Sequence, residues 1–268
     1  MPIFERQGQS LYYEDRNTSG SEGPPLLLLH SFLCSTEMWR AQIAHCSSAR
    51  RVIALDLRGH GRSSPVSGSF TLYDMVDDAI GLLDHLGIDK AVWGGLSIGG
   101  MIAMRATLRY PSRVAALMVL DSHAGRELAS VRIKYAALAA LVRTLGIASV
   151  VRPVLKLMFG VTSFRRRPDL LAEWRVRFMA VDAASMLLVL DALVGRDSVV
   201  EELATIAVPA LVLVGKEDLA LPPARSREIA AHITDAEFFE VPAAGHLSTL
   251  EEPEVINEAI ERFLQKVH

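Results

Sequence analysis

The sequence predicts an α/β fold, with a mostly parallel central sheet that is flanked by helices and carries one helical insertion. Short runs of continuously apolar residues, typical of strands buried on both faces, alternate with segments of helical apolar spacing. Residues 124–203 interrupt this alternation, because they hold several helical stretches and no convincing strand. With 268 residues, 50% of them hydrophobic, the chain is long enough to bury a large core.

Strands are expected at five continuous apolar runs and at one weaker, mixed run near the C-terminus. These runs are residues 25–29, 51–55, 91–93, 114–120, 210–214 and, as the weaker one, 237–241. Tyr12 and Tyr13 are expected in an antiparallel hairpin at the edge of the sheet.

Capping residues and prolines mark the helices. Thr71 and Asp74 have the spacing of a capping box, and Gly87 is typical of a helix end. Pro222 and Pro253 mark the starts of two helices in the last part of the chain.

The interruption divides the chain into two parts. We expect residues 1–123 and 204–268 to form the α/β core, and residues 124–203 to form a helical cap over the carboxyl edge of the sheet. Residues 123–200 hold twelve Lys or Arg and six acids, a balance of +6. Since the whole chain carries −3, the remainder sums to −9, and a basic cap is expected on an acidic core.

The most informative motif is Gly95-Leu96-Ser97-Ile98-Gly99, which follows an apolar run and precedes a helical one. This is the G-x-S-x-G nucleophile elbow in its required setting of strand, sharp turn and helix. The residues two places on either side of the serine must be small in so tight a turn, and both are glycine. Ser97 is therefore the candidate nucleophile. The alternative is a glycine-rich turn that only packs the helix on the sheet.

A serine nucleophile needs a base, usually a histidine that is oriented by a carboxylate. In proteins with this elbow, the acid and the histidine follow the serine along the chain. His246 lies in a loop between the last strand and the last helix, which reaches the same edge of the sheet as Ser97. We therefore take His246 as the candidate base, with His123, just after an earlier strand, as the rival.

The orienting acid is expected just after residues 210–214, where Glu217 and Asp218 are both available. We favour Asp218, because the turn that precedes it would carry the chain back over the sheet edge, and we expect Glu217 to face solvent. Asp121, at the end of an earlier strand, is a second alternative. Without a catalytic role, Asp218 would cap the helix that begins at Pro222.

Acyl transfer also needs backbone donors for the oxyanion that forms on the attacked carbonyl. One donor is expected to be the N–H of Ile98, which follows the nucleophile. The second is expected from the loop after residues 25–29, where Phe32 is the favoured donor and Leu33 the next.

Five segments now stand in a characteristic order: His30-Ser31-Phe32, residues 56–63, the elbow, residues 215–218, and Gly245-His246. In this order they resemble the α/β-hydrolase family over nearly the whole chain except the cap. Within that family, the chain is similar to small bacterial serine esterases and 3-oxoadipate enol-lactonase-like hydrolases.

The resemblance implies the α/β-hydrolase fold, a Ser97–His246–Asp218 triad and an oxyanion hole formed by the Phe32 and Ile98 amides. It also implies that residues 56–63 form a structural turn beside the site. Position 31 departs from the family, which usually has glycine there. The side chain of Ser31 is therefore expected to restrict the loop or to add a hydrogen bond.

These residues predict a serine hydrolase that cleaves carboxylic esters through an acyl-enzyme on Ser97. Serine at the elbow argues against the epoxide hydrolases and haloalkane dehalogenases of the family, which need aspartate there. The alternative enzyme is a lactonase, or a carbon–carbon bond hydrolase, that acts on an anionic ring-cleavage product. The alternative outside enzymes is a ligand-binding receptor on a hydrolase scaffold. The expected partner is a small-molecule ester or lactone.

Composition limits the other function classes. The net charge of −3 argues against nucleic acid, and two cysteines are too few for a disulfide framework or a metal cluster. Without metal-ligand spacings or a phosphate loop, no metal and no cofactor are expected. The apolar stretches are too short to span a bilayer and the N-terminus does not resemble a signal peptide, so we expect no membrane partner and a cytoplasmic location. The sequence leaves the oligomeric state open, a homo-oligomer included.

The cap is expected to choose the substrate. Its basic balance could attract a carboxylate-bearing molecule. We favour the alternative, in which its arginines solvate exposed helix faces and residues 165–167 lie in a surface loop. Eight apolar residues are candidates either to line a pocket or to attach the cap helices to the core: Met158, Phe159, Phe164, Trp174, Phe178, Met179, Met186 and Leu187.

Overall fold

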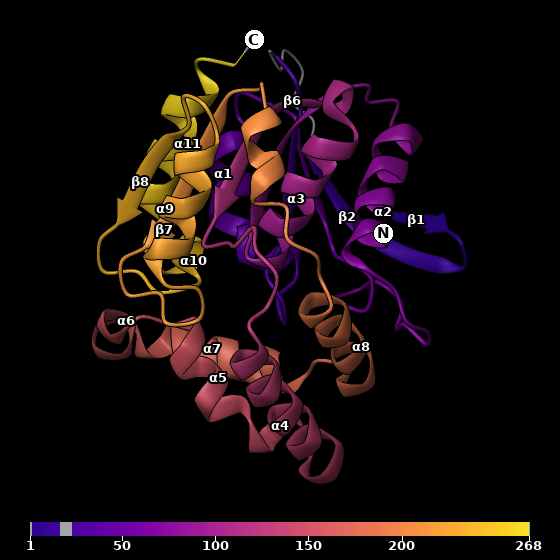
Figure 1. Ribbon diagram of the computed structural model, residues 1–268, viewed down its shortest axis with the longest axis vertical. Coiled ribbons are helices and arrows are strands. Elements are labelled where there is room, and N and C mark those ends of the chain that lie inside the picture. Colours follow the sequence, from indigo (N-terminus) through magenta and orange to yellow (C-terminus); the bar gives the residue numbers. More distant parts are fainter. Residues whose placement is uncertain (1, 17–22, 268) are drawn as a thin grey trace.

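The computed structural model describes residues 2–16 and 23–267 (Figure 1), so residues 1, 17–22 and 268 of the predicted core lie outside the described part. Eight strands form one sheet in the order β1-β2-β4-β3-β5-β6-β7-β8. Their bounds are β1 Ile3–Arg6, β2 Gln9–Arg16, β3 Leu26–Leu29, β4 Val52–Leu55, β5 Ala91–Leu96, β6 Val114–Leu120, β7 Ala210–Gly215 and β8 Glu237–Val241.

The sheet is parallel from β4 to β8, while β2 pairs antiparallel with both β1 and β4. The predicted α/β class and the antiparallel hairpin at the edge are therefore confirmed. All four leucines of β3 are fully buried, since this strand has parallel neighbours on both sides and helices over the sheet.

The helices of the core follow the strands. Because β4 and β5 lie on opposite sides of β3, right-handed crossovers place α1 on one face of the sheet and α2, α3 and α9 on the other. In agreement, α1 packs beside α11 and α2 beside α3. Their bounds are α1 Arg40–Cys46, α2 Leu72–His85, α3 Ile98–Arg109, α9 Pro223–His232, α10 Ser248–Glu251 and α11 Pro253–Leu264.

The predicted start and end of α2 are confirmed. The Thr71 N–H donates to the Asp74 carboxylate at 2.7 Å in the expected capping box. After the helix, Gly87 adopts φ 64°, in the left-handed region that favours glycine.

Five further helices lie between β6 and β7, at the end of the sheet where β6 leads into them (Figure 1). Within the described residues 124–203 there is no strand. None of the helices in the described ranges combines the length and the apolar content needed to cross a membrane. We call these helices the cap: α4 Ala129–Leu145, α5 Val151–Met158, α6 Val161–Arg166, α7 Pro168–Met179 and α8 Ala183–Val194.

The expectation that residues 165–167 lie in a surface loop is wrong in part. Arg165 and Arg166 are exposed, as expected, but they form the last turn of α6. The helix ends at Arg166, because Pro168 disfavours helical backbone at Arg167, the residue before it.

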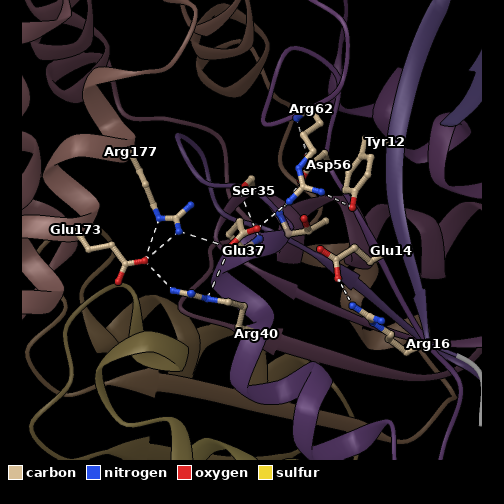
Figure 2. Close-up of polar contacts among 11 residues, drawn as sticks. Tyr12, Glu14, Arg16, Ser35, Glu37, Arg40, Asp56, Arg62, Glu173 and Arg177 are labelled. Atoms are coloured by element: carbon tan, nitrogen blue, oxygen red, sulfur yellow. Dashed lines mark hydrogen bonds and ion pairs between the residues drawn. The ribbon is translucent and has the colours of Figure 1, made fainter. Parts of the chain in front are cut away.

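An exposed ionic cluster joins α7 to the core (Figure 2). Glu37, in the short 3-10 helix η1 Thr36–Trp39, accepts from Arg62 at 2.8 Å and lies 3.5 Å from Arg177. Glu173 accepts from Arg40 at 2.7 Å and from Arg177 at 3.0 Å. Exposed pairs of this kind contribute at most about 1 kcal/mol each. The cluster therefore orients α7 more than it stabilises the fold.

Candidate active site

Ser97 occupies the turn between β5 and α3 with φ 58° and ψ −117°, a backbone conformation that non-glycine residues rarely adopt. A Cβ atom on Gly95 would lie 2.2 Å from the carbonyl carbon of Gly99, and one on Gly99 would lie 2.1 Å from the oxygen of Leu29. Glycine is thus required at both positions by backbone atoms that cannot move aside.

Two hydrogen bonds hold the turn, one to the end of β6 and one from a residue that follows it. The Ser97 N–H donates to the carbonyl of Leu120 at 2.9 Å, and the Ser122 hydroxyl donates to the carbonyl of Ser97 at 2.7 Å. Sequence reasoning did not identify Ser122, because a serine after a strand carries no signal that it supports another segment.

His246 donates from Nδ1 to Oδ2 of Asp218 at 2.8 Å, and both side chains are almost completely buried. Oδ1 of Asp218 accepts from the N–H groups of Ala220 and Leu221 at 2.8 and 2.9 Å. Asp218 therefore does not cap the helix α9, which begins at Pro223. Its carboxylate is held by its own loop and points one oxygen at the histidine.

The environment of His246 favours its protonated form. Burial lowers the pKa of the imidazole, but the negative charge of Asp218 and the hydrogen bond to it outweigh burial, so the pKa lies above its usual value. In the neutral ring, Nδ1 carries the proton that Asp218 accepts, and Nε2 has a free lone pair. A base oriented in this way is suited to take a proton from a hydroxyl.

None of the three alternative residues makes the contact that joins Asp218 and His246. Oδ1 of Asp121 accepts from the Gly215 N–H at 2.7 Å, and its other oxygen accepts from the hydroxyl of Ser248, so neither oxygen is engaged by His246. Burial, and then the nearby charge of Asp218, raise the pKa of Asp121 well above its usual range.

His123 accepts a hydrogen bond from Arg196 at 3.1 Å and lies in a different cavity from Ser97. Burial and the charge of Arg196 lower the pKa of His123 to about 3. The expectation that Glu217 faces solvent is wrong. Its half-buried carboxylate accepts from the backbone N–H and the hydroxyl of Thr162 in α6, at 2.8 and 2.6 Å.

The loop after β3 presents Phe32 to the same side as the elbow. Ile98 is the first residue of α3, so its N–H has no partner in a preceding turn. In residues 2–16 and 23–267, no hydrogen bond is donated by the N–H of Phe32 or Ile98 outside helices and strands. Leu33, the second choice, adopts φ 65° in this loop.

A buried histidine supports the loop. His30 donates from Nδ1 to the carbonyl of Ser31 at 2.7 Å and accepts from the Leu57 N–H at 2.9 Å. Burial lowers the pKa of His30 to about 4, so its ring is neutral. Ser31 lines the pocket, and no residue of the described chain hydrogen-bonds to its buried hydroxyl. The departure from glycine at position 31 therefore adds no hydrogen bond within the protein.

The segment 56–63 forms a turn beside the site. Asp56 accepts from the N–H groups of Thr36 and Arg62 at 2.6 and 2.8 Å, and Arg58 makes a two-pronged pair with Asp78 at 2.7 and 2.8 Å. These charged side chains are therefore engaged within the turn and with α2.

One pocket contains Ser97, His246, Ser31 and Phe32 in its lining. Cap helices α4, α5 and α8 supply most of the remaining lining, which is mainly apolar. Glu127 and Arg196 also line it, and they form a nearly buried ion pair at 3.1 Å. The charges of these two residues therefore largely neutralise each other.

The eight cap candidates separate into three groups. Met158, Met186 and Leu187 line the pocket. Phe159, Trp174 and Phe178 are buried in the packing outside it, and Phe164 and Met179 are each 43% exposed. The alternatives of pocket and packing therefore both occur, and three of the eight residues lie where they can contact a substrate.

Glu251, which sequence reasoning missed, connects the cap with the loop of His246. One carboxylate oxygen accepts from the Gly245 N–H at 2.8 Å, and the other accepts from Gly160 and Ser163 at 2.8 and 2.6 Å. Burial raises the pKa of Glu251 to about 7, against the hydrogen bonds that stabilise its charge. No sequence signal distinguishes Glu251 from the neighbouring Glu252.

Among the described residues, His, Cys, Asp and Glu side chains nowhere form a group of three or more that could hold a metal ion. The arrangement around Ser97 consists instead of a strained serine, a buried histidine–carboxylate pair and an apolar pocket.

Comparison with known proteins defines the class. A family model described as the alpha/beta hydrolase fold matches residues 24–253. The protein is a hydrolase, and the chain belongs to the α/β-hydrolase family, as the motifs predicted.

Its relatives include lactonases and esterases. The chain is 28% identical to 3-oxoadipate enol-lactonase 2 of Acinetobacter baylyi, over 99% of each protein. A malate-bound thermophilic esterase from Thermogutta terrifontis superposes with a TM-score of 0.92 at 32% identity, covering 99% of this chain and 97% of that one. The enol-lactonase from Burkholderia xenovorans LB400 also gives a TM-score of 0.92, at 30% identity over 99% of this chain and 100% of that one.

Proposed function

We propose that this protein is a serine hydrolase that cleaves carboxylic esters through an acyl-enzyme on Ser97. The observation that carries the proposal is the 2.8 Å contact of His246 with Asp218, on a histidine that lines the same apolar pocket as Ser97. The nucleophile, the base and the orienting acid are then Ser97, His246 and Asp218.

In the first half of the reaction, Nε2 of His246 takes the proton from the Ser97 hydroxyl while Oγ attacks the ester carbonyl. The resulting oxyanion accepts from the N–H groups of Phe32 and Ile98, and the positive end of the α3 dipole adds to this stabilisation. His246 then gives its proton to the departing alcohol. In the second half, the same histidine activates water, which releases the acid from Ser97.

The pocket supports a neutral substrate with an apolar acyl or alcohol group. Its lining is mainly apolar, and the charges of Glu127 and Arg196 are paired with each other. A carboxylate-bearing substrate would have to be buried there without a free cation, which is costly. The lactonase alternative is supported by the similarity to enol-lactonases, which are 28% and 30% identical to this chain.

The test compares neutral aryl esters with a carboxylated enol-lactone, using the wild type, Ser97→Ala and Ser198→Ala as an exposed serine control. We expect the neutral esters to be cleaved and Ser97→Ala to lower kcat by about 10⁴-fold or more, while the control keeps its activity. If the enol-lactone is cleaved and the neutral esters are not, the protein is a lactonase and the proposed esterase activity is wrong.

Mass spectrometry after a single turnover tests the covalent step. An activated ester should leave an acyl group on the peptide that contains Ser97 in the wild type and none in Ser97→Ala. If no activated ester acylates Ser97, the receptor alternative takes the place of catalysis.

A further inference from the structure

The cap contains a segment without acidic residues, although Asp191 of α8 lies beside Arg132, Ile133 and Arg143 on the surface. Between Glu127 and Asp169 the chain has eight Lys or Arg and no Asp or Glu. All eight side chains are exposed, and none forms an ion pair with any described residue. They are Arg132, Lys134, Arg143, Arg152, Lys156, Arg165, Arg166 and Arg167.

The same stretch exposes large apolar side chains. It holds seven of the thirteen exposed large hydrophobic residues in the described chain. Ile133 and Leu145 are the most open of the seven, at 71% and 68%. The full set is Leu128, Ile133, Leu141, Leu145, Leu157, Val161 and Phe164, of which Leu157 also lines the pocket of Ser97. We call the exposed residues of 128–168 the cationic cap surface.

Helix α4 shows how the two kinds of residue are arranged. Tyr135, Leu138 and Val142 line the pocket, and their spacing of three and four places them on one face of the helix. Ile133 and Leu141, eight residues apart, are exposed on another face. Basic side chains lie on both sides of this exposed apolar face, since Lys134 follows Ile133 and Arg132 precedes it. Helix α4 is therefore apolar on its inner face and both apolar and cationic outside.

We propose that the protein docks by the cationic cap surface on an anionic lipid surface. Helices with exposed apolar residues and flanking Lys or Arg lie in membrane interfaces, where the apolar groups enter the headgroup boundary and the cations attract anionic lipids. The cap helices α4 to α8 form one end of the molecule, and α4 lies farthest from the sheet in this view (Figure 1).

The charge distribution of the whole chain supports this orientation. Residues 123–200 sum to +6 and the remainder to −9, because the chain as a whole carries −3. An anionic surface therefore attracts the cap and repels the core. The field of such a surface acts within about 10 Å at moderate ionic strength, which is close enough to reach the side chains of a docked cap.

A second copy of the chain fits this surface less well. Two identical cationic cap surfaces would bring sixteen like charges together, and neither segment contains an acid to pair with them. Solvation of the helices does not account for the surface either, since it requires neither the absence of acids nor the exposure of seven large apolar residues. The expectation of no membrane partner rested on the lack of a spanning segment, which peripheral docking does not need.

The test measures co-sedimentation with vesicles of phosphatidylglycerol and phosphatidylcholine, against vesicles of phosphatidylcholine alone. The protein is full length and carries Ser97→Ala, so binding is measured without turnover and stands apart from the proposed catalysis. Two variants change the surface, Ile133→Ser/Leu141→Ser and Arg132→Glu/Arg143→Glu. Two matched controls make the same changes elsewhere, at the exposed residues Leu219 and Phe238 (to Ser) and Lys90 and Arg262 (to Glu).

We expect the anionic vesicles to bind the protein at least about 10-fold more tightly than the neutral ones, and about 1 M salt to remove most of this difference. Each surface variant should weaken binding by about 10-fold or more, and neither control should change it. Three outcomes overturn the proposal: equal binding to both vesicles, equal loss in the controls, or a concentration-dependent dimer that disappears in the surface variants. Cleavage of a soluble ester by Ile133→Ser/Leu141→Ser with Ser97 restored checks that the variant folds.

Discussion

The loops at the carboxyl edge of the sheet and the helix α4 line the same pocket, yet they differ in how they are held. At the sheet edge, Asp218, His246 and Glu251 are buried and hydrogen-bonded to neighbours far away in the chain. In α4, only Ala139 is buried. The difference shows that the side of the pocket with the candidate catalytic residues is fixed by hydrogen bonds, while α4 on the other side is held mainly by apolar packing.

Helix α6 is part of the cap, but like the loops at the sheet edge it is held by hydrogen bonds to residues far away in the chain. Thr162 and Ser163 bind Glu217 and Glu251, and the Leu247 N–H donates to the carbonyl of Met158 at 3.0 Å. The cap is thus attached most firmly beside His246. We expect substitutions to cost most at the sheet edge and least on the outer face of α4.

The largest effect is expected at Asp218. Asp218→Asn should lower kcat by about 10⁴-fold, because the amide would no longer hold His246 in the tautomer that leaves Nε2 free. Asp121→Asn should lower kcat by less than about 10-fold, since Asp121 binds Gly215 and Ser248 instead. Steady-state kinetics on one ester measures both. A larger loss in Asp121→Asn would transfer the orienting role to that residue.

The next largest effect is expected where the loop of His246 contacts the residues just before α6. A Cβ atom on Gly245 would lie 2.3 Å from the nitrogen of Gly160, so Gly245→Ala must displace the His246 loop or α6. Displacement of a catalytic group by about 1 Å can cost about 100-fold in rate, and we expect a loss of kcat of that order.

Gly68→Ala is the matched control, because no atom lies within 4 Å of the added methyl group. It should leave kcat and the melting temperature unchanged. Wild-type kcat in folded Gly245→Ala would show that the contact between Gly245 and Gly160 does not position His246.

Glu251 is expected to make stability depend on pH. Its pKa is raised from 4.5 to about 7, so the folded protein binds a proton more tightly than the unfolded chain does. The resulting stabilisation is complete below about pH 4.5 and is lost as the pH rises through 7. A shift of this size corresponds to about 3 kcal/mol.

Denaturant unfolding of the wild type and Glu251→Gln at several pH values isolates this contribution. As the pH rises from 4.5 to 8, the wild type should lose about 3 kcal/mol of free energy of unfolding relative to Glu251→Gln. Parallel curves for the two proteins would mean that Glu251 has the same pKa in both states.

The smallest effect is expected on the outer face of α4. Leu141→Ser should change the free energy of unfolding by less than about 0.5 kcal/mol and leave the cleavage of a soluble ester unaltered. On the inner face of the same helix, Leu138→Ala should raise KM by about 10-fold for an ester with an apolar acyl group, because Leu138 lines the pocket. Equal KM values for the two variants would contradict the assignment of the two faces.

Local rules were enough to predict the elbow and the sheet. The close approach that requires Gly95 arises within the turn itself, whereas the one that requires Gly99 involves Leu29 of β3, and each central strand is marked by its own apolar run. Asp218 and His246 could be proposed because residues after neighbouring parallel strands meet at one edge of the sheet. Glu217, by contrast, was assigned to solvent, because its partner Thr162 lies 55 residues away in the cap.

The sequence by itself therefore determined the fold class and the family, and it named the candidate residues for the reaction, since each depends on short-range pattern. Only the tertiary structure decided which carboxylate reaches His246, which three of the eight cap candidates line the pocket, and that Glu251 joins cap and core. Glu251 and Gly160 are 91 residues apart, and their contact exists only after the cap has folded over the sheet edge. Burial then raises the pKa of that carboxyl, an effect that depends on surroundings no sequence pattern displays.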